Sequence, residues 1–193
     1  PIEVKNPDGS TEVVDKDLSI RPDTTLEALT QLQPVFSKKG VITAGNSSPL
    51  NAGASALVLM SREKAEKHGI EPMATIKSMG WAGVDPSIMG KGVVPASQNA
   101  LKKAGLGVKD IDFWEINEAF AIVTLYGMDQ LGVDPDKVNI KGGAIAIGHP
   151  LGATGARIVG TLARILKAGN GSYGLATACI GGGQGVATVI ERE

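Results

Sequence analysis

The chain has 193 residues, of which 42% are hydrophobic and 20% charged, and its 19 basic residues are offset by 20 acidic ones. This length suits one well-filled domain with an appendage, and the balanced charge argues against nucleic acid or an anionic membrane surface as a partner. Cys179 is the only cysteine, which excludes an internal disulfide, and the two histidines are far apart in sequence, which argues against a metal site. The single cysteine, together with the lack of a signal peptide or a membrane-spanning run in the sequence, favours a cytoplasmic location.

The first forty residues are the least regular part of the chain. Residues 1–5 and 11–14 alternate in polarity around turn-forming residues, which predicts a small hairpin. Thr25 is a suitable N-cap for a short helix that reaches Leu32. Because strand-like residues follow Pro1 directly, we expect the chain to begin within a longer fold.

From Val41 onward, apolar stretches alternate with helical patterns. Three stretches predict strands, the first of them buried: residues 54–60, 73–84 and 111–116. Helices are expected to follow them, over residues 62–68, 96–104 and 117–131. Two further strands, joined by a glycine-rich hairpin, are expected at residues 173–179 and 186–190. This order predicts an α/β fold, a mixed β-sheet covered by helices on both faces.

The most informative stretch is residues 139–157, in which five glycines surround His149. Glycine lets the backbone bend sharply and approach a ligand closely. Pro150 favours an extended conformation at His149, which holds the imidazole on a rigid turn. The histidine could equally be a buried ring that stabilises the turn through hydrogen bonds, and the residues alone leave both interpretations open.

Two glycine patterns resemble nucleotide-binding loops, but neither has the required context. Residues 143–148 have the glycine spacing of a P-loop, yet His149 and Pro150 follow where Lys and Ser or Thr are needed. Residues 169–174 have the dinucleotide spacing, but they lie between a helix and a strand, the reverse of the required order. Nucleotide binding through these loops is therefore excluded.

Three reactive side chains stand at predicted junctions or beside glycines: Asn117, His149 and Cys179. Each has a structural alternative, since Asn117 could cap a helix and Cys179 could be a small buried hydrophobic residue. A thiol and an imidazole near an amide and backbone donors suit a reaction in which a proton moves and an oxyanion develops. Acyl transfer or carbon–carbon bond chemistry at a thioester would use such a set.

Four motifs in this order resemble the thiolases, the family of acetyl-CoA acetyltransferase and 3-ketoacyl-CoA thiolase. They are Asn117–Phe120 (NEAF), Gly142–Pro150 (GGAIAIGHP), Gly152–Arg157 (GATGAR) and Cys179–Gly183 (CIGGG). Similar segments upstream extend the resemblance to essentially the whole chain. It implies the C-terminal half of an enzyme of fatty-acid metabolism, with residues 1–40 as the tail of an inserted loop domain and residues 41–193 as the C-terminal thiolase domain.

The resemblance also implies roles for four residues. His149 would activate a nucleophilic cysteine of the N-terminal half, which has no counterpart here. Cys179 would exchange the proton at the substrate's α-carbon. Asn117 would hold a water that, with His149, receives the enolate oxygen, and the N–H of Gly181 would contribute to a second oxyanion hole. Without the acyl-accepting cysteine, the chain by itself is expected to be inactive.

For the substrate side, the resemblance implies binding of acyl-CoA and CoA, without a metal or a separate cofactor. The implied substrate- and CoA-binding residues are Phe36, Ala44, Ser48, Met89 and Phe120. The implied partners are an N-terminal thiolase half and further copies of the complete enzyme, as a dimer or tetramer. Ala52 departs from the family, because many thiolases have Asp there. The alternative function is a thiolase-like subunit that binds acyl-CoA, or serves as a scaffold, without catalysis.

Overall fold

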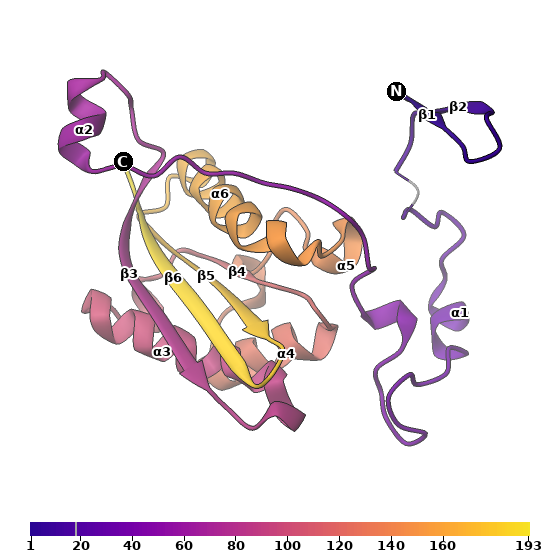
Figure 1. Ribbon diagram of the computed structural model, residues 1–193. Coiled ribbons are helices and arrows are strands. Elements are labelled where there is room, and N and C mark those ends of the chain that lie inside the picture. Colours follow the sequence, from indigo (N-terminus) through magenta and orange to yellow (C-terminus); the bar gives the residue numbers. More distant parts are fainter. Residues whose placement is uncertain (18) are drawn as a thin grey trace.

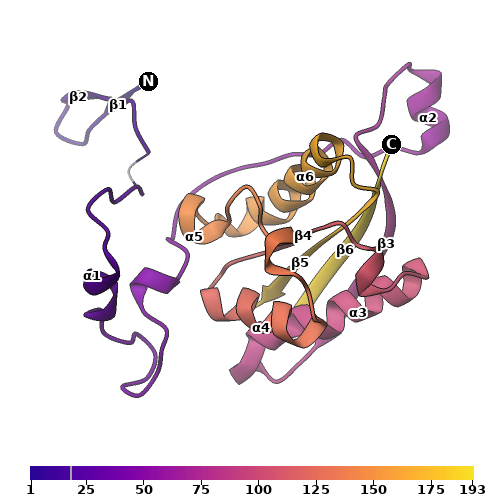
Figure 2. The same ribbon diagram turned by 180° about the vertical axis from the view of Figure 1, so that it is seen from behind.

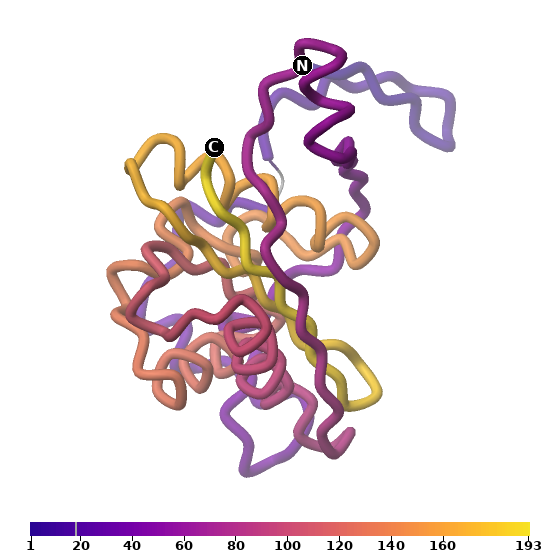
Figure 3. Tube along the Cα trace, turned by 90° about the vertical axis from the view of Figure 1, so that its left-hand side faces the viewer, coloured from indigo at the N-terminus to yellow at the C-terminus, as the bar shows by residue number. Residues whose placement is uncertain are grey.

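The computed structural model describes residues 1–17 and 19–193. Its centre is a four-stranded sheet with the order β3-β6-β5-β4 (Figure 1). The strands are β3 (Ala74–Gly83), β4 (Phe113–Ile116), β5 (Tyr173–Ile180) and β6 (Gln184–Arg192). The β4–β5 pair is parallel and the other two pairs are antiparallel, and the long β3 and β6 run side by side in Figure 3. The predicted α/β fold with a mixed sheet is confirmed.

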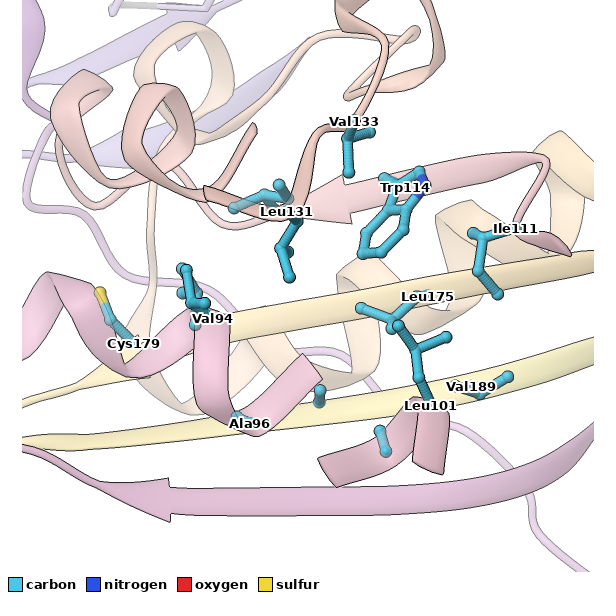
Figure 4. Close-up of a cluster of buried hydrophobic side chains, with 14 of the residues drawn as sticks. Val94, Ala96, Leu101, Ile111, Trp114, Leu131, Val133, Leu175, Cys179 and Val189 are labelled. Carbon is cyan, nitrogen blue, oxygen red and sulfur yellow. The ribbon is translucent and has the colours of Figure 1, made fainter. Parts of the chain in front are cut away.

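Helices cover both faces of this sheet (Figures 1 and 2). Helix α6 (Leu151–Gly169) lies on one face, and α3 (Val93–Ala104) and α4 (Ala121–Leu131) lie on the other. Side chains alternate along β4, so Trp114 and Ile116 join the hydrophobic cluster with α3 and α4, whereas Phe113 packs with residues of α6. Figure 4 shows Trp114 in the larger cluster. Two apolar layers thus stabilise the sheet from both sides.

Shorter elements complete the chain, and several helices begin or end at the residues that the sequence predicts. They are α1 (Leu26–Thr30), α2 (Arg62–Lys67), α5 (Ala144–Ile147) and the 3₁₀ turns η1 (Ala44–Asn46), η2 (Pro86–Gly92), η3 (Val108–Asp110) and η4 (Pro135–Lys137). The side chain of Thr25 caps α1 and that of Ser61 caps α2. Gly105 ends α3 in a left-handed conformation with φ 71°.

The described residues among the first forty lie outside the four-stranded sheet, as predicted. Strands β1 (Ile2–Lys5) and β2 (Thr11–Val14) pair antiparallel in a separate two-stranded sheet, and α1 follows them. Figure 1 shows this N-terminal part to one side of the four-stranded sheet. None of the residues of β1, β2 or α1 is buried.

The prediction of a buried strand at residues 54–60 is wrong. The segment runs as an extended stretch past α6 in Figure 1 without joining a sheet, and Val58 and Leu59 are 85% and 71% exposed. A buried strand needs neighbours for its backbone hydrogen bonds and a layer over its side chains. The described residues supply only isolated contacts with α6, such as the bond from Ser55 Oγ to the carbonyl of Ala153 (2.6 Å).

Candidate active site

Asn117 and Cys179 stand at the same edge of the sheet. Ile116, the last residue of β4, is paired with Thr177 of β5, and the N–H of Asn117 donates to the carbonyl of Thr177 (2.9 Å). Because β4 and β5 are parallel neighbours, their carboxyl ends meet at one edge, where functional groups of α/β proteins commonly lie. The backbones of Asn117 and Cys179 are therefore close neighbours, although 62 positions separate them in the sequence.

The side chain of Asn117 turns towards His149 and does not cap a helix. Helix α4 begins only at Ala121, with Phe120 at its N-cap position, so the helix-cap interpretation of Asn117 is wrong. Asn117 Nδ2 lies 3.3 Å from His149 Nε2. Asn117 is only 2% exposed, and its Oδ1 is buried with no hydrogen-bond partner among the described residues. The structure thus brings together two of the residues that the sequence singled out.

His149 is held on three sides. Its main-chain N–H donates to Asn51 Oδ1 (3.1 Å), and its Nδ1 lies 2.6 Å from Thr154 Oγ1. Gly148 precedes it with φ 103°, and a Cβ there would overlap the Asn51 side chain, so only glycine fits. The sequence analysis missed Asn51 and Thr154. The only local signal was a threonine one helical turn after Pro150, at the start of a helix of small residues.

Burial and charge favour the neutral form of His149. Its pKa is lowered from the ordinary value, first by burial and then by the positive charge of Arg157. A neutral imidazole at neutral pH can accept a proton. Burial also raises the pKa of the Cys179 thiol, and a main-chain hydrogen bond offsets this only in part, so the thiol carries its proton at neutral pH.

A carboxylate ties the end of β4 to the loop that leads to the histidine. Glu118 accepts hydrogen bonds from Asn139 Nδ2 (2.8 Å) and from the main-chain N–H of Ile145 (3.1 Å). Asn139 also bonds both main-chain groups of Ile116, at 2.9 Å each. A Cβ at Gly143 would overlap the carboxyl group of Glu118. These contacts hold the two segments of the site in a fixed relation.

A second carboxyl group, Glu115, is buried beneath α6. It lies on the same face of β4 as Phe113, is 1% exposed, and has an Oε1 with no hydrogen-bond partner among the described residues. Burial raises its pKa to about 7; the charge of Arg157 lowers that pKa and the charge of Glu118 raises it. The sequence analysis missed this residue, because a Glu in a short strand gives no sign of being buried.

Cys179 packs in the cluster formed with α3, where Figure 4 shows it beside Val94. It is 7% exposed. Gly181 opens the turn to β6, in which Gly182 and Gly183 adopt left-handed φ values of 84° and 85°. Whether Cys179 and the N–H of Gly181 share one pocket with the other two residues stays a prediction.

Three of the five residues expected on the substrate side, Phe36, Ser48 and Phe120, lie around the segment after β4. The rings of Phe36 and Phe120 meet edge to face with their centroids 5.5 Å apart. Ser48 donates through both its N–H (3.1 Å) and its Oγ (3.2 Å) to the carbonyl that precedes Phe120. Met89 packs on the same hydrophobic cluster as Phe120, whereas Ala44 is exposed at the start of η1. Three of the five residues are therefore in one place, and their contacts with substrate stay predicted.

The described parts of the chain contain neither a candidate metal site nor a candidate membrane-spanning helix. Residues 1–17 and 19–193 contain no group of three or more His, Cys, Asp or Glu placed to hold a metal ion. Within the same ranges, no helix combines the length and apolarity needed to cross a bilayer.

Comparison with known families decides the identity of the fold. The family described as "Thiolase, C-terminal domain" matches residues 70–192, and "Thiolase, N-terminal domain" matches residues 1–63. The chain belongs to the thiolase family. The division of this thiolase chain into a loop-domain tail at residues 1–40 and a C-terminal domain at residues 41–193 stays a prediction.

Curated thiolases and solved structures match the chain along its whole length. The chain is 56% identical to a 3-ketoacyl-CoA thiolase of Marinobacter nauticus and 54% identical to one of Vibrio vulnificus. Both alignments cover 100% of this chain, but only 50% of the first relative and 51% of the second. Human mitochondrial 3-ketoacyl-CoA thiolase has a TM-score of 0.85 at 47% identity, and Bacillus anthracis acetyl-CoA acetyltransferase has 0.91 at 46%. Both structures cover 100% of this chain, which covers 49% of each of them. The chain therefore spans about half the length of the curated relatives it matches.

Proposed function

We propose that the chain supplies the C-terminal catalytic half of a 3-ketoacyl-CoA thiolase, which transfers an acyl group to CoA or, in reverse, condenses acetyl-CoA units. The observation that carries the proposal is the contact between Asn117 Nδ2 and His149 Nε2 (3.3 Å) at the edge of the sheet where Cys179 also lies, one residue before the end of β5. The names of the relatives support it, and one solved neighbour is described as human mitochondrial 3-ketoacyl-CoA thiolase in complex with CoA.

In the proposed reaction, His149 acts as the base. It takes the proton of the nucleophilic cysteine of the N-terminal half, and the thiolate attacks the 3-keto carbon of the substrate. The bond between C2 and C3 then breaks, which leaves an acyl-enzyme and the enolate of acetyl-CoA. The thiol of a CoA molecule then attacks the acyl-enzyme and gives its proton to Cys179, which is a thiolate once it has protonated the enolate. The shortened acyl-CoA is released, and the nucleophilic cysteine takes its proton back from His149.

The remaining residues handle the proton and the developing charge. Cys179 donates a proton to the enolate carbon, and its raised pKa suits a thiol that must hold that proton at neutral pH. Asn117, through a water, and His149 stabilise the enolate oxygen, while the N–H of Gly181 helps to stabilise the tetrahedral oxyanion. No metal and no separate cofactor is proposed, since CoA thioesters are the substrates.

The proposed substrate contacts follow from the cluster beside Phe120. Phe36, Phe120 and Met89 would line the acyl or pantetheine path with apolar surface, whereas Ser48 and Ala44 would face the pantetheine end of CoA. An N-terminal half and further copies of the complete enzyme are the proposed partners. A reducing compartment such as the cytoplasm is the proposed location, because the single thiol is assigned to catalysis.

The second candidate function is a thiolase-like subunit that binds acyl-CoA without turning it over. One observation favours it for this chain alone: its only thiol, Cys179, has a raised pKa and is a poor nucleophile at neutral pH. The two functions differ in what an added N-terminal half does. A catalytic half gains turnover from it, and a binding subunit does not.

The test is thiolysis of acetoacetyl-CoA by free CoA, measured with the chain alone and with a polypeptide that supplies the N-terminal half. We expect no turnover alone and steady turnover in the mixture. In the mixture, Cys179→Ala should still form the acyl-enzyme from a simple acyl-CoA, while the carbon–carbon step falls by about 10²–10⁴-fold, the usual contribution of general acid–base catalysis. His149→Ala should impair both steps. Turnover by the chain alone, or a Cys179→Ala variant with normal condensation, would refute these assignments.

A further inference from the structure

The hydroxyl group of Thr154 links His149 to the start of α6. Thr154 Oγ1 lies 3.0 Å from the carbonyl oxygen of Pro150 and 2.6 Å from His149 Nδ1. The residue is 3% exposed, so water does not compete for these contacts. A hydroxyl group has one proton to donate and can accept others. It can therefore donate to only one of its two neighbours.

The carbonyl of Pro150 is an acceptor only, which limits the possibilities. If Thr154 donates to that carbonyl, it must accept a hydrogen bond from Nδ1–H of His149. Nε2 then carries no proton and can accept from Asn117 Nδ2, which lies 3.3 Å away. This arrangement uses all three short contacts as hydrogen bonds.

The alternative arrangement makes one hydrogen bond fewer. If Thr154 donates to His149 Nδ1, the neutral ring carries its proton on Nε2, and the Asn117 amide must turn its oxygen towards the ring. The bond between the Thr154 hydroxyl and the carbonyl of Pro150 is then lost. The Asn117 amide does not distinguish the two arrangements, because the group turned away from the ring lacks a described partner in both, Oδ1 in the first and Nδ2 in the second. The first arrangement is favoured, because it keeps a buried hydrogen bond that the alternative loses.

We infer that Thr154 is a positioning residue that selects the tautomer of His149 with the proton on Nδ1, leaving Nε2 as the atom that accepts a proton. The inference rests on the proposed function of His149 as a base and deepens it. When Nε2 takes up a proton, Nδ1–H continues to donate to Thr154, so the ring keeps its position through the transfer. The imidazole can thus pass the proton on without rotating.

The first experiment reads the tautomer directly in this chain, assembled with the polypeptide that supplies the N-terminal half. With ¹⁵N-labelled histidine at a pH above the pKa of His149, long-range ¹H–¹⁵N spectra distinguish protonated from unprotonated ring nitrogens; a His149→Asn variant identifies the signals. We expect Nδ1–H in the wild type and in Thr154→Ser, which keeps the hydroxyl, and a shift towards Nε2–H in the nearly isosteric Thr154→Val. Nε2–H in the wild type, or unchanged Nδ1–H in Thr154→Val, would overturn the inference.

The second experiment separates positioning from mere stability. General-base catalysis raises the rate roughly 10²–10⁴-fold. We expect kcat to fall about tenfold or more in Thr154→Val, whereas Thr154→Ser retains most of the activity. Thr161→Val, a control on the same helix outside the site, should match the wild type, and thermal unfolding shows whether each variant is folded. Equal losses in the Ser and Val variants would contradict a role for the hydroxyl. If His149→Ala retained thiolysis, the proposed function would fail while the spectra still decided the tautomer.

Discussion

At the scale of single residues, Glu115 makes stability depend on pH. Its pKa is raised to about 7 by burial, so the folded state binds this proton more tightly than the unfolded state, where a glutamate has its ordinary pKa of 4.5. The stabilising contribution is complete below about pH 4.5 and is lost as the pH rises through 7. We expect Glu115→Gln to remove this loss and flatten the pH dependence of unfolding between those values.

Urea unfolding at several pH values between 4.5 and 8 measures the effect. The matched control is Glu71→Gln, because Glu71 is an exposed carboxylate that pairs with Lys167 at the surface. The control should follow the wild-type profile. A Glu115→Gln profile as steep as that of the wild type would show that the carboxyl group does not titrate in the folded protein near neutral pH.

At the scale of elements, the Glu118 clamp predicts that Gly143 tolerates no side chain. Gly143 has an ordinary negative φ of −133°, so the obstacle is the overlap of a Cβ with the Glu118 carboxyl group and not backbone strain. Overpacking a well-filled site costs about 1–3 kcal/mol, and we expect Gly143→Ala to lower the free energy of unfolding by that amount. The loop would shift as well, which should weaken the contact between Asn117 and His149.

A double-mutant cycle with Glu118→Ala checks the cause. Both single changes break the same clamp, so the double variant should cost less than the sum of the two. Denaturant unfolding measures the free energies, and thiolysis in the reconstituted enzyme measures the consequence for the site. Strictly additive losses would mean that Gly143 and Glu118 act independently.

At the scale of the whole molecule, the exposed segment at residues 54–60 predicts how the chain behaves in solution. Its apolar side chains, Val58 and Leu59 above all, face outward from an extended backbone without strand neighbours. Large exposed apolar patches and unpaired strands promote association. Since the chain spans about half of its relatives, we expect an N-terminal thiolase half to cover this segment.

Replacing Val58 with Lys should therefore reduce self-association of the chain, measured by sedimentation velocity, and weaken its assembly with the N-terminal half. Val13→Lys is the matched control, because Val13 is also exposed but lies in the separate β1–β2 hairpin. The control should change neither property. Unaltered self-association in the Val58 variant would place the interface elsewhere.

Local features of the fold were determined by the sequence alone. Thr25 and Ser61 cap their helices and Gly105 ends α3, because capping and left-handed turns depend on a few neighbouring residues. The strands around β3, β5 and β6 were also predictable, since apolar stretches bounded by turn residues are local patterns. The motifs around Asn117, His149 and Cys179 were sufficient to indicate the thiolase family, which the family matches confirm.

Only the tertiary structure decided which groups touch. The contact between Asn117 and His149 joins positions 32 apart. The local sequence by itself also suited a helix cap at Asn117, which the start of α4 at Ala121 excludes. Asn51 lies 98 positions from His149, whose main-chain N–H donates a hydrogen bond to the Asn51 side chain. Residues 54–60 were wrongly predicted to be a buried strand because an apolar pattern records a preference for burial but not whether neighbouring strands are there to provide it. Sheet neighbours and side-chain partners come from distant parts of a chain, so they are properties of the packed molecule.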